Sequence, residues 1–173
     1  MTEFLRLDMG PKSLIPAGHP NGALFLGNIP NAIEWLREGP SKRYKAILNC
    51  TDDPELDWAQ TEQWVDILRL DHWDGEEYPP EKIRQAIHWI EAHMATGAAV
   101  LVCCHAGISR SPGIVLAYLM SKGYDYNEAV RIIRKARPFI QIHPKIDLSV
   151  RKYFGLAPRS AADLIPGDSI TGY

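Results

Sequence analysis

The feature that most constrains the fold is a segment near the middle of the chain that changes character twice. Residues 98–103 form a short apolar run with two valines, which is typical of a strand buried in a parallel sheet. The residues that follow are small and loop-like, with Gly107 among them. From Arg110 onward the pattern is helical, and Pro112 falls in the first turn, where its missing N–H costs little. The segment therefore predicts a strand, a tight loop and a helix, with Cys104 where the strand ends.

This arrangement has a chemical use. A loop that runs into a helix start directs several backbone N–H groups at one point, and the helix dipole adds positive potential there. Such a site holds a dianionic phosphate and favours the thiolate form of a cysteine such as Cys104. Arg110 can bind two phosphate oxygens at once through its planar guanidinium. The segment therefore predicts a phosphate site with a nucleophilic sulfur directed at phosphorus.

The string CHAGISRS, from Cys104 to Ser111, resembles the signature of the cysteine-based protein phosphatases, in particular the dual-specificity group. The resemblance covers residues 22–156, and it implies that Cys104 is the nucleophile, that Arg110 binds phosphate and that Ser111 helps the sulfur to leave. One position departs from the family pattern, because Cys103 stands where the family usually has histidine. The residues that the resemblance places around the phosphate are His105, Ala106, Gly107, Ile108, Ser109 and Arg110.

Strands and helices alternate through residues 22–156. This alternation predicts a single-domain α/β fold with a mainly parallel central sheet flanked by helices on both faces, as the resemblance to the protein-tyrosine-phosphatase-like fold also implies. We expect residues 1–21, which contain several glycines and prolines, to be an irregular lead-in and residues 157–173 to be a tail. The expected strands cover residues 23–29, 44–50, 65–70 and 98–103, and the expected helices cover 32–38 (with Asn31 as the cap), 80–96, 110–122, 126–137 and 145–154.

Cleavage of a phosphate ester needs a proton for the leaving oxygen, and a carboxylic acid on a loop near the phosphate can supply it. In parallel sheets ligands bind at the carboxyl ends of the strands, so the loop after residues 65–70 should lie beside Cys104. Its acidic residues are Asp71, Asp74, Glu76 and Glu77. The family pattern aligns its general acid with Asp74, and Asp71 is the alternative.

Cys50 ends another predicted strand. If that strand neighbours the strand of Cys104, the two ends lie about 4.8 Å apart, within the roughly 4.4–6.8 Å Cα separation that a disulfide tolerates. Some family members carry a cysteine at this strand end, so the resemblance implies that Cys50 is a redox partner of Cys104. The alternative is that Cys50 is only a small buried hydrophobe. Cys103 is a poorer partner, because adjacent cysteines close only a strained ring, and it is not expected to be a second nucleophile, because alternation points its side chain away from that of Cys104.

Composition narrows the class of protein. The net charge of −2 and the pI near 6.3 give no general attraction to nucleic acid or anionic membranes. No apolar run approaches the ~20 residues of a membrane span, and the N-terminal residues lack the features of a signal peptide. Three cysteines without zinc-like spacing indicate a reducing compartment. We therefore expect a cytoplasmic monomer without a metal or cofactor.

The leading hypothesis is a phosphoprotein phosphatase that hydrolyses phosphotyrosine and phosphoserine/threonine esters through a phosphocysteine. A second is a phosphate-reading module without turnover (a pseudophosphatase), and only the departure at Cys103 favours it. A third, a sulfur- or arsenate-handling enzyme, fits the upstream acidic loop poorly. Eight acidic residues follow two of the predicted strands, so we expect an acidic entrance that favours phosphopeptides with neighbouring Lys or Arg. These residues are Asp52, Asp53, Glu55, Asp57, Asp71, Asp74, Glu76 and Glu77.

Overall fold

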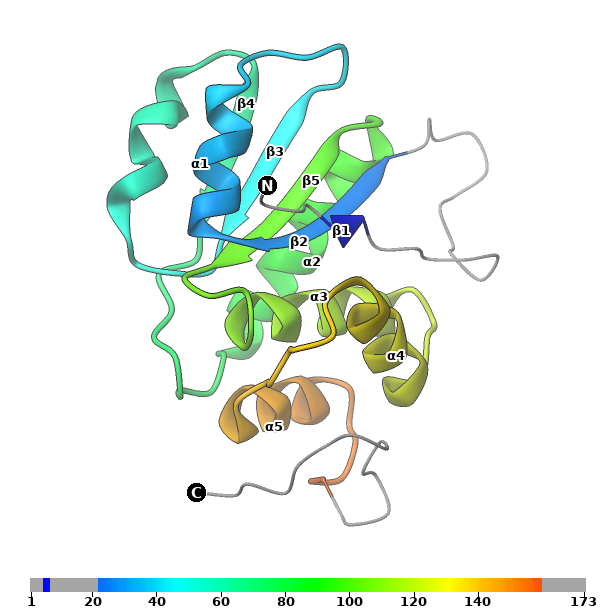
Figure 1. Ribbon diagram of the computed structural model, residues 1–173. Helices are drawn as coiled ribbons and strands as arrows, with labels where there is room; N and C mark the ends of the chain where they lie inside the picture. The colour runs from blue at the N-terminus through cyan, green and yellow to red at the C-terminus, as the bar shows by residue number, and fades with distance from the viewer. Residues whose placement is uncertain (1–4, 7–21, 160–173) are drawn as a thin grey trace.

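The computed structural model describes residues 22–159 and the backbone of residues 5–6. Its centre is a five-stranded sheet in the order β1-β2-β5-β3-β4 (Figure 1). Strands β2, β5, β3 and β4 all run parallel to one another, whereas β1 is antiparallel to β2. The strands are β1 (Leu5–Arg6), β2 (Ala23–Asn28), β3 (Lys45–Asn49), β4 (Val65–Arg69) and β5 (Ala99–Cys104).

Helices cover both faces of the sheet. Helix α1 and the 3₁₀ helix η1 lie on one face, and α2, α3, α4 and α5 lie on the other (Figure 1). This arrangement confirms the predicted α/β fold. The helices are α1 (Ile29–Arg37), η1 (Pro54–Thr61), α2 (Pro80–Ala95), α3 (Arg110–Ser121), α4 (Tyr126–Ala136) and α5 (Pro144–Tyr153). Within the described residues, no helix combines the length and apolar composition that crossing a membrane demands.

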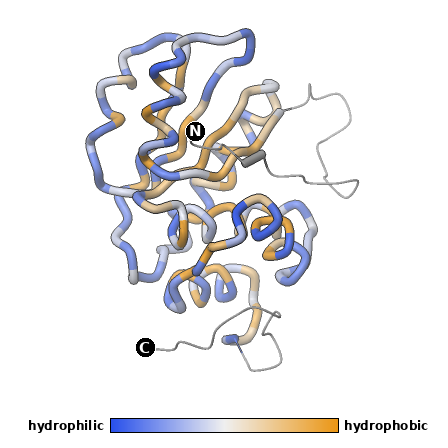
Figure 2. The backbone as a smooth tube through the Cα atoms, in the orientation of Figure 1, coloured by the Kyte–Doolittle hydropathy of each residue, from blue (hydrophilic) through white to orange (hydrophobic). Residues whose placement is uncertain are grey.

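The central strand β5 divides the core into two layers. Its six residues are all buried, and successive side chains point to opposite faces. Val102 and Cys104 join the larger core beneath α2–α5, whereas Leu101 and Cys103 join the smaller core beneath α1 and η1. Figure 2 shows the apolar residues concentrated in these central strands, with hydrophilic residues in the outer loops. The strand therefore separates the side chains of Cys103 and Cys104, as alternation predicts.

Helix α1 starts earlier than predicted. Asn28, not Asn31, is its N-cap: Asn28 Oδ1 accepts a hydrogen bond from the Asn31 N–H (2.9 Å), and Asn31 Oδ1 accepts one from the Asn28 N–H (3.0 Å). The helix extends back across Pro30 because a proline in the first turn removes an N–H that has no intrahelical partner.

The N-terminal lead-in is also more regular than predicted at one point. Residues 5 and 6 form β1 and pair with Leu26 and Phe25 of β2. A two-residue strand is too short to show alternation, so its sequence carries no signal. The rest of the expected lead-in and residues 160–173 of the expected tail lie outside the described residues, and residues 157–159 form neither helix nor strand.

Candidate active site

Cys104 is the last residue of β5 and is 2% exposed. The loop after it turns through Gly107, whose φ is +66°, a conformation that glycine adopts at little cost. A Cβ at that position would lie 2.5 Å from the Gly27 carbonyl oxygen, so both backbone conformation and space demand glycine. Ser111 follows in the first turn of α3, and its Oγ lies 3.2 Å from Cys104 Sγ. The predicted nucleophile and its predicted hydroxyl partner are thus in contact.

Arg110 connects the phosphate loop (residues 104–110) to the acid loop (residues 71–78). It begins α3 and is 7% exposed. Its Nη1 donates a hydrogen bond to the His72 carbonyl (2.9 Å), and its own carbonyl accepts one from the Tyr78 hydroxyl (3.3 Å). The guanidinium therefore lies between the two loops that the sequence predicts at one edge of the sheet.

The two candidate acids have different surroundings. Asp74 Oδ1 accepts a hydrogen bond from Ser109 Oγ (3.1 Å), which places this carboxylate at the phosphate loop. Asp71 instead forms an ion pair with Arg69 (2.7 Å), and its side chain is 55% exposed. Asp71 also adopts a φ of +48°, so the backbone turns at this residue. Of the two carboxylates, Asp74 is the one bonded to the phosphate loop.

The acid loop is held by contacts along its length. The His72 ring stacks on Tyr78 with 3.8 Å between ring centroids, and its Nε2 lies 3.0 Å from the Glu76 carbonyl oxygen. Burial is the main cause that lowers the pKa of His72, so the neutral ring is favoured and Nε2–H donates to that carbonyl. These contacts fix the backbone on both sides of Asp74.

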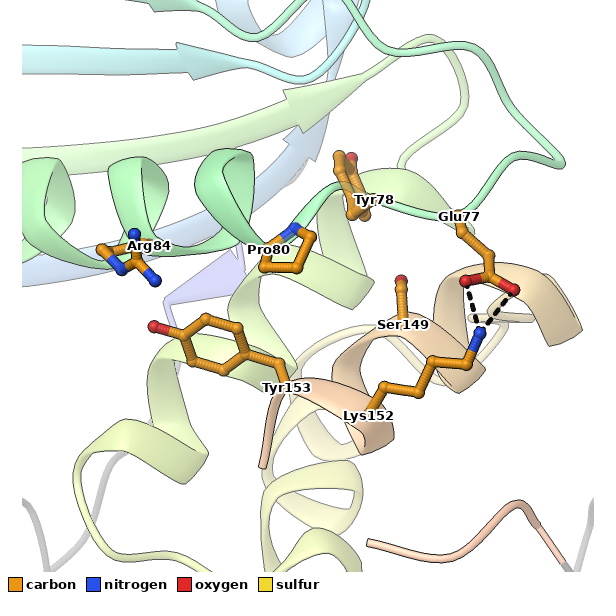
Figure 3. Close-up of a pocket in the computed structure, with 7 residues that line it drawn as sticks. All are labelled: Glu77, Tyr78, Pro80, Arg84, Ser149, Lys152 and Tyr153. Atoms are coloured by element: carbon orange, nitrogen blue, oxygen red, sulfur yellow. Dashed lines mark hydrogen bonds and ion pairs between the residues drawn. The ribbon is translucent and has the colours of Figure 1, made fainter. Parts of the chain in front are cut away.

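The end of the acid loop borders a pocket of about 510 Å³ between α2 and α5 (Figure 3). Glu77 crosses one side of this pocket to pair with Lys152 of α5 (2.7 Å). Both side chains are substantially exposed, and exposed ion pairs contribute only ~0–1 kcal/mol. No residue of the phosphate loop lines the pocket, so it is separate from the candidate active site.

Cys50 lies beside Cys104. Asn49 of β3 is paired with Cys103 of β5, and the Cys50 N–H donates to the Cys103 carbonyl (2.8 Å), so Cys50 and Cys104 follow at the same level of neighbouring strands. Both side chains belong to the larger core, and each of the three cysteines is a free thiol. Burial raises the pKa of Cys50, and the negative charge of Cys104 raises it further. Burial is also the main cause that raises the pKa of Cys103. These two cysteines are therefore kept as neutral thiols.

The rim of the candidate active site is less acidic than the sequence suggests. Arg69 pairs with both Asp57 (2.9 Å) and Asp71 (2.7 Å), and Glu77 pairs with Lys152 as described. Three of the eight predicted rim carboxylates are thus paired, with two cations between them. At the phosphate loop, His105 is half-exposed, and its Nδ1 lies 3.6 Å from Asp53 Oδ2.

Arg137 is a site residue that the sequence did not indicate. It follows α4, is 5% exposed, and donates hydrogen bonds from Nε to the Gly107 carbonyl (2.7 Å) and from Nη2 to the Ala106 carbonyl (2.9 Å). His143, at the start of α5, donates its backbone N–H to Ser109 Oγ (3.0 Å). A basic residue at the end of a helix normally indicates interaction with the helix dipole, so the pattern gave no sign that the side chain of Arg137 contacts the loop 30 residues earlier.

A strand-ending thiol, a glycine turn, a helix-starting arginine and a nearby carboxylate are the groups that the resemblance to the cysteine-based phosphatases predicts for this site. The model of the family "Dual specificity phosphatase, catalytic domain" matches residues 24–153, and the chain belongs to this family. This membership confirms the resemblance that the signature from Cys104 to Ser111 indicated.

Individual relatives agree with this assignment. The chain is 32% identical over 123 residues to mouse dual specificity protein phosphatase 15, covering 70% of this chain and 50% of the relative. It is 35% identical over 118 residues to the putative tyrosine phosphatase 123R of Invertebrate iridescent virus 6, covering 68% and 77%. The crystal structure of DUSP15 superposes with a TM-score of 0.64 at 28% identity, covering 75% of this chain and 81% of that one. The chain spans half or less of the length of the first curated relatives.

Proposed function

We propose that this protein hydrolyses phosphotyrosine and phosphoserine/threonine esters of proteins through a phosphocysteine intermediate. The observation that carries the proposal is the convergence on one loop of Cys104 Sγ, Ser111 Oγ, the Arg110 guanidinium and, through Ser109, the Asp74 carboxylate. These groups supply a nucleophile, a positive field and a proton donor within one site at the carboxyl edge of the sheet.

In the first step, the Cys104 thiolate attacks phosphorus and forms the S–P bond. The P–O bond to the leaving group breaks, and its electron pair stays on the ester oxygen. Asp74, in its protonated form, gives its proton to that oxygen. The loop amides and the Arg110 guanidinium hold the equatorial phosphate oxygens while charge redistributes. Because these groups supply the positive field, we expect no metal or cofactor.

In the second step, water attacks phosphorus and the S–P bond breaks. The Asp74 carboxylate accepts the proton of the attacking water, which restores the acid for the next turnover. The sulfur leaves as a thiolate, and the Ser111 hydroxyl, 3.2 Å from Sγ, donates a hydrogen bond to the developing charge. Inorganic phosphate is then the product.

We also propose that the protein acts as a cytoplasmic monomer on phosphorylated proteins, and not on nucleic acids or membrane lipids. The family and the modest net charge of −2 support this substrate class. The unpaired rim carboxylates still disfavour polyanions, but pairing of Asp57, Asp71 and Glu77 weakens that effect. We therefore expect only a modest preference for phosphopeptides with neighbouring Lys or Arg, stronger at low salt.

Hydrolysis of an aryl phosphate and of phosphopeptides by wild-type protein and Cys104→Ser tests the proposal. We expect turnover by the wild type, none by Cys104→Ser, retained tungstate binding by both, and a phosphocysteine adduct detectable by mass spectrometry after acid quench. Tungstate binding without any turnover by the wild type would instead establish a phosphate-reading module. Turnover by Cys104→Ser near the wild-type rate would exclude Cys104 as the nucleophile.

A further inference from the structure

We propose that Arg137 is a positioning residue that aims backbone amides of the phosphate loop at the phosphate. Its guanidinium holds the carbonyls of Ala106 and Gly107 from outside the loop. This inference rests on the proposed function for its catalytic consequence, but its effect on phosphate binding does not depend on turnover.

The guanidinium of Arg137 is held by contacts with the phosphate loop and with the Phe139 ring. The Nε and Nη2 atoms of Arg137 reach two consecutive carbonyls at 2.7 and 2.9 Å. The Phe139 ring lies over the guanidinium, with 4.7 Å from Cζ to the ring centroid. A Cβ at Gly107 would lie 2.8 Å from Nη2, so the glycine leaves the space that the guanidinium occupies.

Peptide geometry converts this contact into an orientation of the amides. In a planar trans peptide, the C=O and the N–H of the same unit point in opposite directions. The Ala106 carbonyl shares its unit with the Gly107 N–H, and the Gly107 carbonyl shares its unit with the Ile108 N–H. Because Arg137 holds both carbonyls on one side, both N–H groups face the other side, where the loop binds phosphate.

A third peptide unit is fixed in the same way. The Ile108 carbonyl accepts a hydrogen bond from the Gln141 N–H (2.9 Å), which directs the Ser109 N–H. Three successive amides are thus oriented by the connector between α4 and α5. Of these contacts, the one from Arg137 is made by a side chain, so substitution can test it.

The positive charge of Arg137 also lies beside the phosphate loop. Within the described residues, no carboxylate pairs with its guanidinium, so the carbonyl dipoles and the anionic site are its electrostatic partners. Burial lowers the pKa of Arg137, and the negative charge of Cys104 acts in the opposite direction. A role limited to ending α4 would not need these contacts, because the side-chain hydrogen bonds from Nε and Nη2 go to Gly107 and Ala106 and not to a carbonyl of that helix.

The test compares Arg137→Met and Arg137→Lys with the control Arg131→Met, which removes an exposed arginine from the preceding helix α4. In a Cys104→Ser background, we measure tungstate binding by calorimetry and the amide shifts of Gly107 and Ile108 on binding by NMR. We expect both Arg137 variants to bind tungstate at least tenfold more weakly and to lose those two shifts, while the Arg110 amide still responds. In the active background, we expect kcat/KM to fall on the order of 10²-fold, the usual effect of misplaced catalytic groups.

Wild-type binding and shifts in Arg137→Met would overturn the proposal. Full function in Arg137→Lys would also overturn it, since charge alone would then suffice and orientation would not matter. If Arg137→Met fails to fold, Arg137→Lys alone decides between these outcomes. If the wild type shows no turnover but the Arg137 variants still lose tungstate binding, the positioning role stands and the proposed function fails.

Discussion

Replacement of each candidate acid by its amide is the sharpest test of the catalytic assignment. Asp74→Asn removes the proton that we assign to the leaving group but keeps an oxygen that can accept the hydrogen bond from Ser109 Oγ. Asp71→Asn is its matched control, because asparagine tolerates the positive φ of +48° at this position. Both substitutions remove one negative charge from the same loop.

The expected magnitudes differ because the two carboxylates have different partners. Loss of a general acid lowers kcat by roughly 10²–10⁴, which corresponds to about 3–5 kcal/mol of transition-state stabilisation. Loss of the exposed ion pair between Asp71 and Arg69 costs only ~0–1 kcal/mol of folding stability. We therefore expect Asp74→Asn to be nearly inactive but stable, and Asp71→Asn to turn over near the wild-type rate, because the partner of Asp71 is Arg69 and not a residue of the phosphate loop.

The assay is kcat/KM for two aryl phosphates, one with a good and one with a poor leaving group, measured across pH. A poor leaving group needs the proton more, so the loss in Asp74→Asn should be larger for that substrate. The basic limb of its pH–rate profile should also flatten, because no acid remains to deprotonate. Thermal unfolding of each variant checks that the fold is unchanged.

The reasoning is refuted if Asp71→Asn shows the leaving-group dependence and Asp74→Asn does not. Equal, small losses in both variants would show that neither carboxylate is the general acid. In that case the hydrogen bond from Ser109 to Asp74 would be structural.

Three further predictions concern other parts of the site. After treatment with mild peroxide, peptide mapping should detect a Cys50–Cys104 disulfide, and a thiol reductant should restore activity. In Cys50→Ser the loss of activity should be irreversible, because Cys104 proceeds to sulfinic acid; equal recovery of activity by the wild type and Cys50→Ser would contradict this prediction. Arg110→Lys should lower kcat/KM severely, on the order of 10²-fold or more, because an ammonium cannot form the bidentate contact; near-normal kinetics would show that a point charge suffices. The folded state lowers the pKa of His72, so its contribution to stability is present above the unfolded value of about 6.5 and is lost as pH falls below it. His72→Phe should therefore show a smaller fall in the free energy of unfolding between about pH 7 and 5 than the wild type, and denaturant titrations with parallel pH dependences would exclude His72 as a cause.

Local sequence patterns were sufficient to predict most helices and strands and the loop that contains Cys104. The apolar run of β5, Gly107 and the helical pattern after Arg110 each reflect short-range physics, so strand, turn and helix could be predicted from adjacent residues. The approach of Cys50 to Cys104 followed from the rule that parallel strands end at one edge of a sheet. β1 was missed because two residues show no periodicity.

The side-chain contacts that loops make with distant segments could not be predicted. Asp71 and Asp74 are three residues apart and chemically identical, and only the path of the acid loop shows that Asp74 reaches Ser109. The pairing of Asp71 with Arg69 depends equally on that path. Arg137 resembles an ordinary basic residue at a helix end, and its role is visible only once α4 is packed beside the phosphate loop.

The connector between α4 and α5 explains how a loop of small residues can be held so firmly. Four consecutive residues of the phosphate loop are each bonded from residues 137–143: the carbonyls of Ala106, Gly107 and Ile108, and the hydroxyl of Ser109. The hydroxyl of Ser109 also donates a hydrogen bond to Asp74, so one connector holds the phosphate loop and, through Ser109, helps to place the candidate acid. Hydrogen bonds tolerate donor–acceptor distances of only about 2.7–3.2 Å, so one residue inserted in the connector would have to be accommodated without moving these donors. The spacing between Arg137 and His143 therefore matches the spacing of the loop residues that they contact.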